Sequence, residues 1–283
     1  MQRTLRATAQ RWLREGRRSV VVEVTRTQGS VPREAGTRML VSESEAVGTI
    51  GGGHLEFKAL DRARAMLVDT TVGPASEHYA LGPSLGQCCG GAVTLGYAVL
   101  DSGTLARWPA PRALFDLQMY GAGHVGLAIA TLLATLDCDV DWIDERTQAW
   151  PQTTALGAPW PEHIRRVCVD AVESEVALAR PGAYYLVLTH SHALDLRITQ
   201  AIVQRADFGY LGLIGSRTKR QRFMQRFEQL GLDSDAVRRM HCPIGVPGIS
   251  AKAPEIVAVA VVAQLLAQCE ITTAARMVTA AVP

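Results

Sequence analysis

One glycine-rich stretch constrains the fold of this chain more than any other. The sequence YGAGHVG, residues 120–126, places Gly121, Gly123 and Gly126 in the spacing GxGxxG, between an apolar run and a helical pattern. Glycines in this spacing permit a tight turn, the approach of a phosphate and close helix packing. The helix N-terminus adds free N–H groups and a positive dipole for an anion. The stretch predicts a Rossmann-like sheet; a vestigial site in that fold is the alternative.

The second half of the chain alternates strand and helix patterns. Near-continuous apolar strands separated by helices indicate a parallel sheet that is covered on both faces. Residues 113–283 are therefore predicted to form a Rossmann-like α/β domain. Its strands are expected at 113–121, 139–145, 164–170, 183–190 and 210–216, and its helices at 124–136, 193–206, 219–231 and at the end of 234–268.

The first hundred residues predict a smaller α+β domain, residues 1–100, that is dominated by strands. Residues 101–112 contain glycine, two prolines and a tryptophan that looks exposed, which is typical of an interdomain linker. The Arg-rich N-terminus has no apolar segment of a secretory signal; it resembles a transit peptide faintly and an amphipathic helix more closely. That helix would carry Leu5, Ala9, Trp12 and Leu13 on one face.

Composition excludes several classes of protein. The 283 residues are 48% hydrophobic and 20% charged, which is typical of a globular protein. A net charge of +2 argues against a nucleic-acid surface, and the apolar run 256–263 is shorter than the roughly 20 residues that span a bilayer. The scattered cysteines form no CxxC pair, so a reducing cytoplasm is expected. Those expected to be inert packing residues are Cys138, Cys168, Cys242 and Cys269.

Two charged groups follow strands of the predicted parallel sheet, where ligands of such sheets bind. Asp144 ends the strand after the glycine motif, at the distance expected for an acceptor of a ribose 2′-OH. Arg217 follows a later strand and is the preferred anion contact. Its neighbours Lys219, Arg220 and Arg222 are expected mainly on a solvated helix face.

The segment LTHSHALD also follows a predicted strand. His190, His192 and Asp195 would then face the same crevice as the glycine motif. A general acid–base role and a simple hydrogen-bonded loop both remain open for these side chains.

The first domain carries two further glycine-rich segments. Gly51, Gly52 and Gly53 precede a helix and would cradle an anion by the same physics as the Rossmann loop, or form a plain turn. Cys88 and Cys89 stand directly before two glycines. Either thiol alone would be core filler, but the open backbone favours access and a thiolate, which suits a soft metal.

Together these stretches resemble the xanthine dehydrogenase accessory proteins, a family that handles the molybdenum cofactor. The resemblance extends over nearly the whole chain. In the first domain it lies in GSVPREAGTRMLV (29–41), GTIGGGHLE (48–56) and GQCCGG (86–91). In the second it lies in GAGHVG (121–126), LTHSHALD (188–195), GLIGSRTKR (212–220) and PIGVPGISAKAPEIVAVAVVAQLL (243–266).

The resemblance implies a chaperone rather than an enzyme. Such proteins bind molybdenum cofactor (molybdopterin), protect it while a cysteine desulfurase sulfurates it, and deliver it to the molybdenum-containing subunit of xanthine dehydrogenase. It implies Cys89 as the sulfur contact to molybdenum, with Cys88 beside it, and a homodimer. His54 stands where some relatives have cysteine. Which loop binds the phosphate, which binds the metal and which form of the cofactor is carried stay open.

Two other functions fit parts of the sequence. An NAD(P)-dependent oxidoreductase would use the Rossmann loop and Asp144 for its cofactor, and His190 or His192 as proton donor. Against it stands the first domain, because a dehydrogenase needs no thiol pair beside glycines. A metal-sensing or scaffold protein with a degenerate pocket would bind neither ligand.

Overall fold

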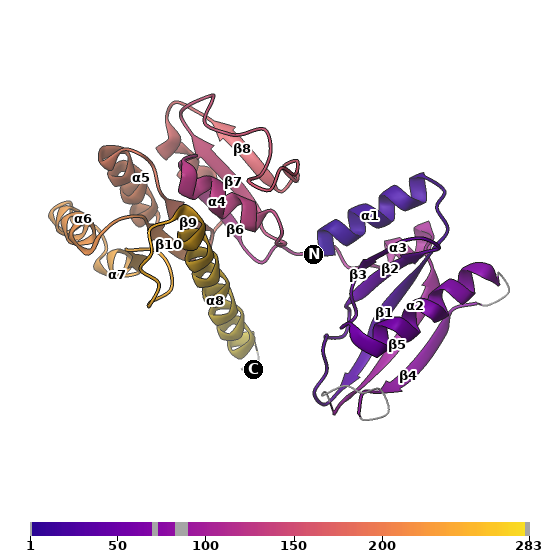
Figure 1. Cartoon of the computed structure of the whole chain (residues 1–283). Coiled ribbons are helices and arrows are strands. Elements are labelled where there is room, and N and C mark those ends of the chain that lie inside the picture. Colours follow the sequence, from indigo (N-terminus) through magenta and orange to yellow (C-terminus); the bar gives the residue numbers. More distant parts are fainter. Residues whose placement is uncertain (1, 70–72, 83–89, 281–283) are drawn as a thin grey trace. The chain divides into compact units, whose positions relative to one another are not determined.

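The computed structural model describes residues 2–69, 73–82 and 90–280. The chain divides into two compact units, Met1–Pro111 and Arg112–Pro283, which are labelled by element in Figure 1. Each unit is described by itself.

The first unit is built on an antiparallel sheet of five strands in the order β3-β2-β1-β5-β4. The strands are β1 (Ser19–Gln28), β2 (Arg38–Ser42), β3 (Ala46–Gly48), β4 (Ala75–Ala80) and β5 (Ala92–Val99). The helices are α1 (Gln2–Arg14), α2 (Gly53–Val68) and α3 (Ser102–Ala106).

Alternation along β1 explains how both faces of this sheet are covered. Val20, Val22 and Val24 belong to a buried cluster with the apolar side chains of α2. Val21 points the other way, into a cluster formed with α1 and α3. Successive side chains of a strand face opposite sides, so a run of valines supplies both cores. As predicted, α1 is amphipathic, with its buried face formed by Leu5, Ala9 and Trp12.

The segment expected as an interdomain linker, 101–112, belongs to the first unit up to Pro111. Asp101 caps α3 by accepting a hydrogen bond from the backbone N–H of Thr104. Leu105 and Trp108 are both 8% exposed and lie against α1. The expectation that the tryptophan is exposed is therefore wrong, because α1 offers it an apolar surface that the local sequence does not show.

The second unit contains a parallel sheet of six strands in the order β8-β7-β6-β9-β10-β11. Numbered from β6, this is the 3-2-1-4-5-6 order of dinucleotide-binding folds, with its switch point between β6 and β9. The predicted α/β fold class, with a Rossmann-like C-terminal sheet, is confirmed. The strands are β6 (Asp116–Tyr120), β7 (Asp139–Asp144), β8 (Ile164–Cys168), β9 (Tyr184–Val187), β10 (Tyr210–Leu213) and β11 (Met240–His241).

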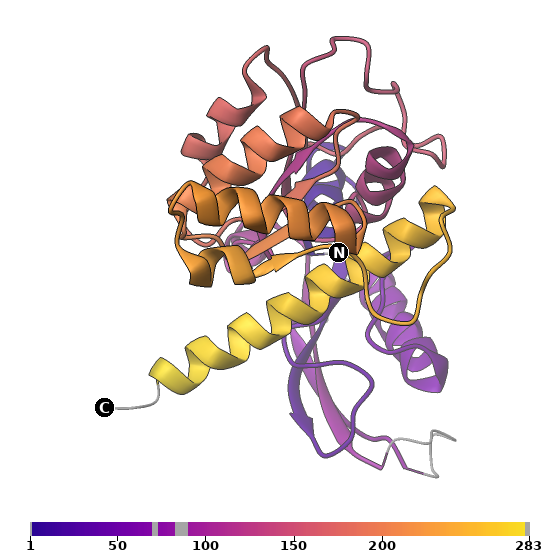
Figure 2. The ribbon, with the colours of Figure 1, turned by 90° about the vertical axis from the view of Figure 1, so that its left-hand side faces the viewer.

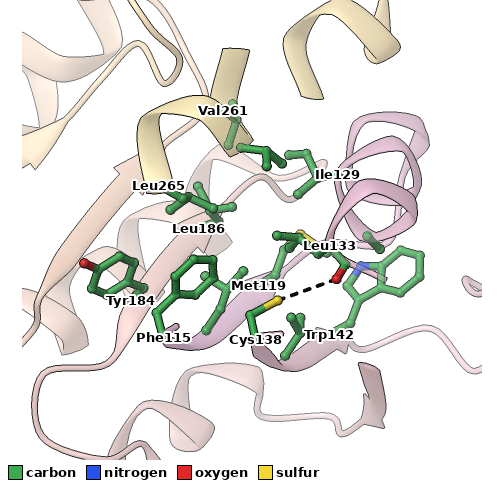
Figure 3. Packing of buried hydrophobic residues seen from close by; sticks show 14 of the residues in the cluster. Phe115, Met119, Ile129, Leu133, Cys138, Trp142, Tyr184, Leu186, Val261 and Leu265 are labelled. Atoms are coloured by element: carbon green, nitrogen blue, oxygen red, sulfur yellow. Dashed lines mark hydrogen bonds between the residues drawn. The ribbon is translucent and has the colours of Figure 1, made fainter. Parts of the chain in front are cut away.

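Helices cover both faces of this sheet. One face packs on α4 (His124–Leu133) and α8 (Pro254–Ala280), and Figure 3 shows Val261 and Leu265 of α8 close to Ile129 and Leu186. The other face packs on the helices that follow the later strands. These are the 3₁₀ helix η2 (Val172–Leu178), α5 (His192–Arg205), α6 (Arg217–Gln229) and α7 (Ser234–Arg238).

Figure 2 shows α8 as one continuous helix. Its part Pro254–Thr272 has a mean hydropathy of 1.6 and is long and apolar enough to cross a membrane. The same part also contributes fully buried side chains, among them Val261 and Leu265, to the core of the second unit. A core helix of a globular domain passes the same test of length and composition, and 28% of the tested window is buried.

Candidate functional sites in the two units

The three motif segments of the first unit meet at close range. The backbone N–H of Gly91 donates a hydrogen bond of 3.1 Å to the carbonyl oxygen of Ser30. A Cβ atom at Gly91 would lie 2.4 Å from that oxygen, and one at Gly51 would lie 2.6 Å from Cγ of Pro32. Only glycine permits these two approaches. Segments 29–41, 48–56 and 86–91 are thus joined through the loop at residues 29–32.

Cys88 and Cys89, the predicted metal contacts, lie outside the described residues. Both described ends of their segment are anchored. The N–H of Leu81 donates to the carbonyl oxygen of Gly91 at 2.9 Å, and Gly91 itself is held by Ser30. Leu81 and Gly91 are therefore bonded to each other, and Gly91 adjoins the loop at residues 29–32.

The glycine loop at residues 51–53 already binds an anion of the chain itself, the side-chain carboxylate of Glu56. All three glycines have positive φ, between 64° and 127°. One carboxylate oxygen of Glu56 accepts hydrogen bonds from the Thr49 hydroxyl at 2.5 Å and from the N–H groups of Ile50 and Gly52 at 3.1 Å each. The loop thus offers an external anion fewer free donors than its sequence pattern predicts.

His54 follows this loop on the exposed start of α2. Its ring lies roughly parallel to that of Phe57, with centroids 6.3 Å apart. Phe57 is 60% exposed, so the helix presents two rings to solvent beside the glycine loop.

The three glycines of the Rossmann loop serve different purposes. A Cβ at Gly121, where φ is +113°, would lie 2.4 Å from the carbonyl oxygen of Leu188. A Cβ at Gly126 would lie 2.3 Å from the carbonyl oxygen of Gly121. Gly123, the N-cap of α4, has an ordinary extended backbone, and no described atom lies within 4 Å of its Cβ position. Two glycines are therefore required for packing, and Gly123 leaves space in front of a helix N-terminus.

Asp144 ends β7 as predicted, but its carboxylate is turned into the protein. It is 6% exposed and accepts hydrogen bonds from the N–H of Ala122 and from the side chain and N–H of Arg146. Burial alone would raise the pKa of Asp144, but the hydrogen bonds from Arg146 and Ala122 outweigh it and lower the pKa. Asp144 thus holds the glycine loop against β7.

Arg146 is a candidate that sequence reasoning missed. Its side chain is 49% exposed, and its ion pair with Asp144 holds it beside the glycine loop. The signal in the sequence is a basic residue two positions after the acidic end of the second strand. His190 is 56% exposed and its Nε2 lies 3.9 Å from a carboxylate oxygen of Glu145. The two loops that carry Arg146 and His190 therefore adjoin at this edge of the sheet.

Lys219 is buried rather than solvated. Its Nζ lies 2.5 Å from Oδ2 of Asp195 and donates a second hydrogen bond to the carbonyl oxygen of Ile214. The other carboxylate oxygen of Asp195 accepts from the hydroxyl and the N–H of Thr189. The prediction of a solvated helix face is wrong for Lys219. This ion pair ties segment 188–195 to segment 212–220 and occupies the carboxylate of Asp195.

Arg217, His192 and Cys168 lie on the surface, whereas Cys138, Cys242 and Cys269 are buried, as expected of packing residues. Arg217 is exposed at the start of α6, where Ser216 caps the helix. The ring of His192, at the start of α5, packs edge-on against the ring of Phe223 on α6. Cys168 is exposed, which corrects its expected role as a packing residue. Within residues 2–69, 73–82 and 90–280, no group of three or more His, Cys, Asp or Glu side chains is placed to hold a metal ion.

Comparison with known proteins identifies the family. Residues 117–265 match the family model of the XdhC Rossmann domain, and residues 12–79 match that of the XdhC and CoxI family. The chain belongs to the XdhC family. The resemblance that the sequence motifs indicate is thereby confirmed.

One curated protein and one solved structure are also similar to this XdhC-family chain. The Uncharacterized protein YqeB of Escherichia coli (strain K12) is 29% identical over 259 residues, which cover 87% of this chain and 42% of YqeB. The chain thus spans less than half of that curated relative. A crystal structure from Bacillus halodurans, described as a xanthine dehydrogenase, aligns with a TM-score of 0.74 at 18% identity and covers 94% of this chain and 95% of its own. That likeness shows a shared fold.

Proposed function

We propose that this XdhC-family chain is an accessory protein of xanthine dehydrogenase maturation. It binds molybdenum cofactor, protects it while a cysteine desulfurase sulfurates it, and delivers it to the molybdenum-containing subunit of xanthine dehydrogenase. The cofactor is cargo, and no residue is assigned a catalytic role. A cytoplasmic location and a homodimer are part of the same proposal. Family membership supports the proposal.

The observation that carries it is the meeting of the three motif segments in the first unit. Gly91, which follows the segment with Cys88 and Cys89, is held by Ser30, and Gly51 of the glycine loop packs closely against Pro32. A thiolate is a ligand that soft metals prefer. We therefore take Cys89, with Cys88 beside it, as the sulfur contact to molybdenum.

In the first unit, Glu56 already accepts hydrogen bonds from the N–H groups of Ile50 and Gly52 at the glycine loop, so the second unit is considered by itself for a phosphate site. The space in front of Gly123, at the N-terminus of α4, suits a phosphate because helix N-termini carry free N–H groups and a positive dipole. Arg217 and His190 stand at the same, carboxyl end of the sheet. The Rossmann loop is therefore the candidate phosphate site within the second unit.

Molybdenum retention tests the sulfur contact. After anaerobic incubation with molybdenum cofactor and gel filtration, Cys89→Ala is expected to retain about tenfold less metal than the wild-type protein, because loss of a metal ligand weakens affinity at least as much as loss of its outer-shell partners. Cys168→Ala, at an exposed thiol of the second unit, is the control and should retain the wild-type amount. Equal metal content in both variants would remove Cys89 from the site.

The Gly123→Ala variant tests the phosphate site. The backbone there suits alanine, so stability should be unchanged, but the new methyl group enters the open space and should weaken cofactor binding by about tenfold. Gly73→Ala, at another open glycine without a left-handed backbone, is the matched control. Cofactor affinity is measured by equilibrium dialysis. Unaltered affinity of Gly123→Ala would place the phosphate elsewhere.

A further inference from the structure

The carboxylate of Asp144 has no remaining capacity to accept hydrogen bonds. Its Oδ1 accepts from the N–H and the Nε of Arg146, both at 2.9 Å. Its Oδ2 accepts from the N–H of Ala122 at 2.7 Å and from Nη2 of Arg146 at 2.8 Å. A carboxylate offers about four lone-pair sites in total. Each of them has a partner within the protein.

Because the carboxylate of Asp144 is saturated with hydrogen bonds, it limits which ligand can bind at this edge of the sheet. In dinucleotide-binding folds the acidic residue at this position accepts a hydrogen bond from the ribose 2′-OH. Here a ribose hydroxyl would have to displace Arg146 or Ala122 from Asp144, and the displaced donor would lose a charge-assisted bond. A ligand with a free ribose diol therefore gains little at Asp144.

The group that faces outward at the same place is a cation. Arg146 uses Nε and one N–H of Nη2 on Asp144, and a guanidinium has further N–H donors on Nη1 and Nη2. Its side chain is 49% exposed. Of the nearby carboxylates, Asp144 is paired with Arg146 itself, and Glu145, whose charge also acts on Arg146, lies 3.9 Å from His190. A planar guanidinium with free N–H groups matches a phosphate.

We infer that the ligand site at the carboxyl ends of β6 and β7 selects a phosphomonoester, with Arg146 as the residue that recognises it in place of a ribose hydroxyl. The inference deepens the proposed function and rests on it for the assignment of cargo. Two sources share this chemistry: the terminal phosphate of a pterin cofactor and the 2′-phosphate of a nucleotide.

NADPH and NADH test the inference directly, because they differ only in the 2′-phosphate. Titration monitored by nicotinamide fluorescence should show NADPH binding at least about tenfold tighter to the wild-type protein. Arg146→Gln should bring the ratio of the two dissociation constants close to one. Arg165→Gln is the matched control, since Arg165 also pairs with an aspartate of β7, Asp141, and is 71% exposed. This control should keep the wild-type ratio.

Three outcomes overturn the inference: equal affinity of the wild-type protein for both nucleotides, binding of neither, or an unchanged ratio in Arg146→Gln. Because a ratio is measured, a general loss of stability cannot imitate the expected result. Competition with molybdenum cofactor released from a molybdenum enzyme then distinguishes the two sources. Displacement of NADPH assigns the phosphate to the pterin, and independent binding assigns it to a nucleotide. Molybdenum retention by the Arg146→Gln variant reports on the carrier proposal separately.

Discussion

Replacing Lys219 by methionine is expected to lower the free energy of unfolding of the second unit by about 3–5 kcal/mol. Asp195 is 1% exposed and Lys219 is 8% exposed, so the substitution leaves a buried carboxylate without its counter-ion. The hydrogen bonds from Thr189 remain, but they cannot neutralise the charge. Urea denaturation followed by circular dichroism measures the loss.

Two further variants separate the ion pair from its surroundings. Arg217→Met, on the exposed first turn of the same helix, should change stability by less than about 0.5 kcal/mol, as is usual for surface substitutions. The double variant with Asp195→Asn and Lys219→Met removes both charges and should recover part of the loss. Wild-type stability of Lys219→Met would show that Asp195 needs no counter-ion.

The Gly121→Ala variant is expected to lose about 3 kcal/mol or more of folding free energy. A non-glycine residue in this left-handed region costs about 1–3 kcal/mol by itself. In addition, the new Cβ would lie 2.4 Å from the carbonyl oxygen and 2.8 Å from the carbonyl carbon of Leu188, and backbone atoms cannot move aside as a flexible side chain can. The midpoint of thermal unfolding measures the effect.

Gly123→Ala serves as the internal comparison, two residues further along the same loop. It adds the same methyl group where no described atom lies within 4 Å, so its unfolding midpoint should stay at the wild-type value. Equal midpoints for the two alanine variants would contradict the division of the loop into packing glycines and an open glycine.

Much of the fold follows from patterns of short range. The apolar strands around the glycine motif predict a parallel sheet, because both faces of each strand must be buried. The valine run of β1 predicts a strand by composition, although only the structure shows that its two faces serve different helices. The strand β11, two residues long, is too short for periodicity to reveal.

The side-chain partners could not be predicted in the same way. Lys219 belongs to a run of basic residues that is typical of a solvated surface, and its burial depends on Asp195 of another helix. The carboxylate of Asp144 is saturated with hydrogen bonds because of Arg146, and no sequence motif distinguishes that arginine. The burial of Trp108 likewise depends on a distant part of the sequence, because α1, which begins the unit, covers it. Tertiary contacts of this kind override local propensity.

The Glu56 carboxylate has a consequence for the folding of the glycine loop. Glycine loses more conformational freedom on folding than any other residue, so three consecutive glycines are costly to keep ordered. The donors of Thr49, Ile50 and Gly52 are satisfied by Glu56, so hydrogen bonds from within the chain hold this loop. These internal bonds therefore offset the entropy loss when the chain folds, and no ligand is needed to order this backbone.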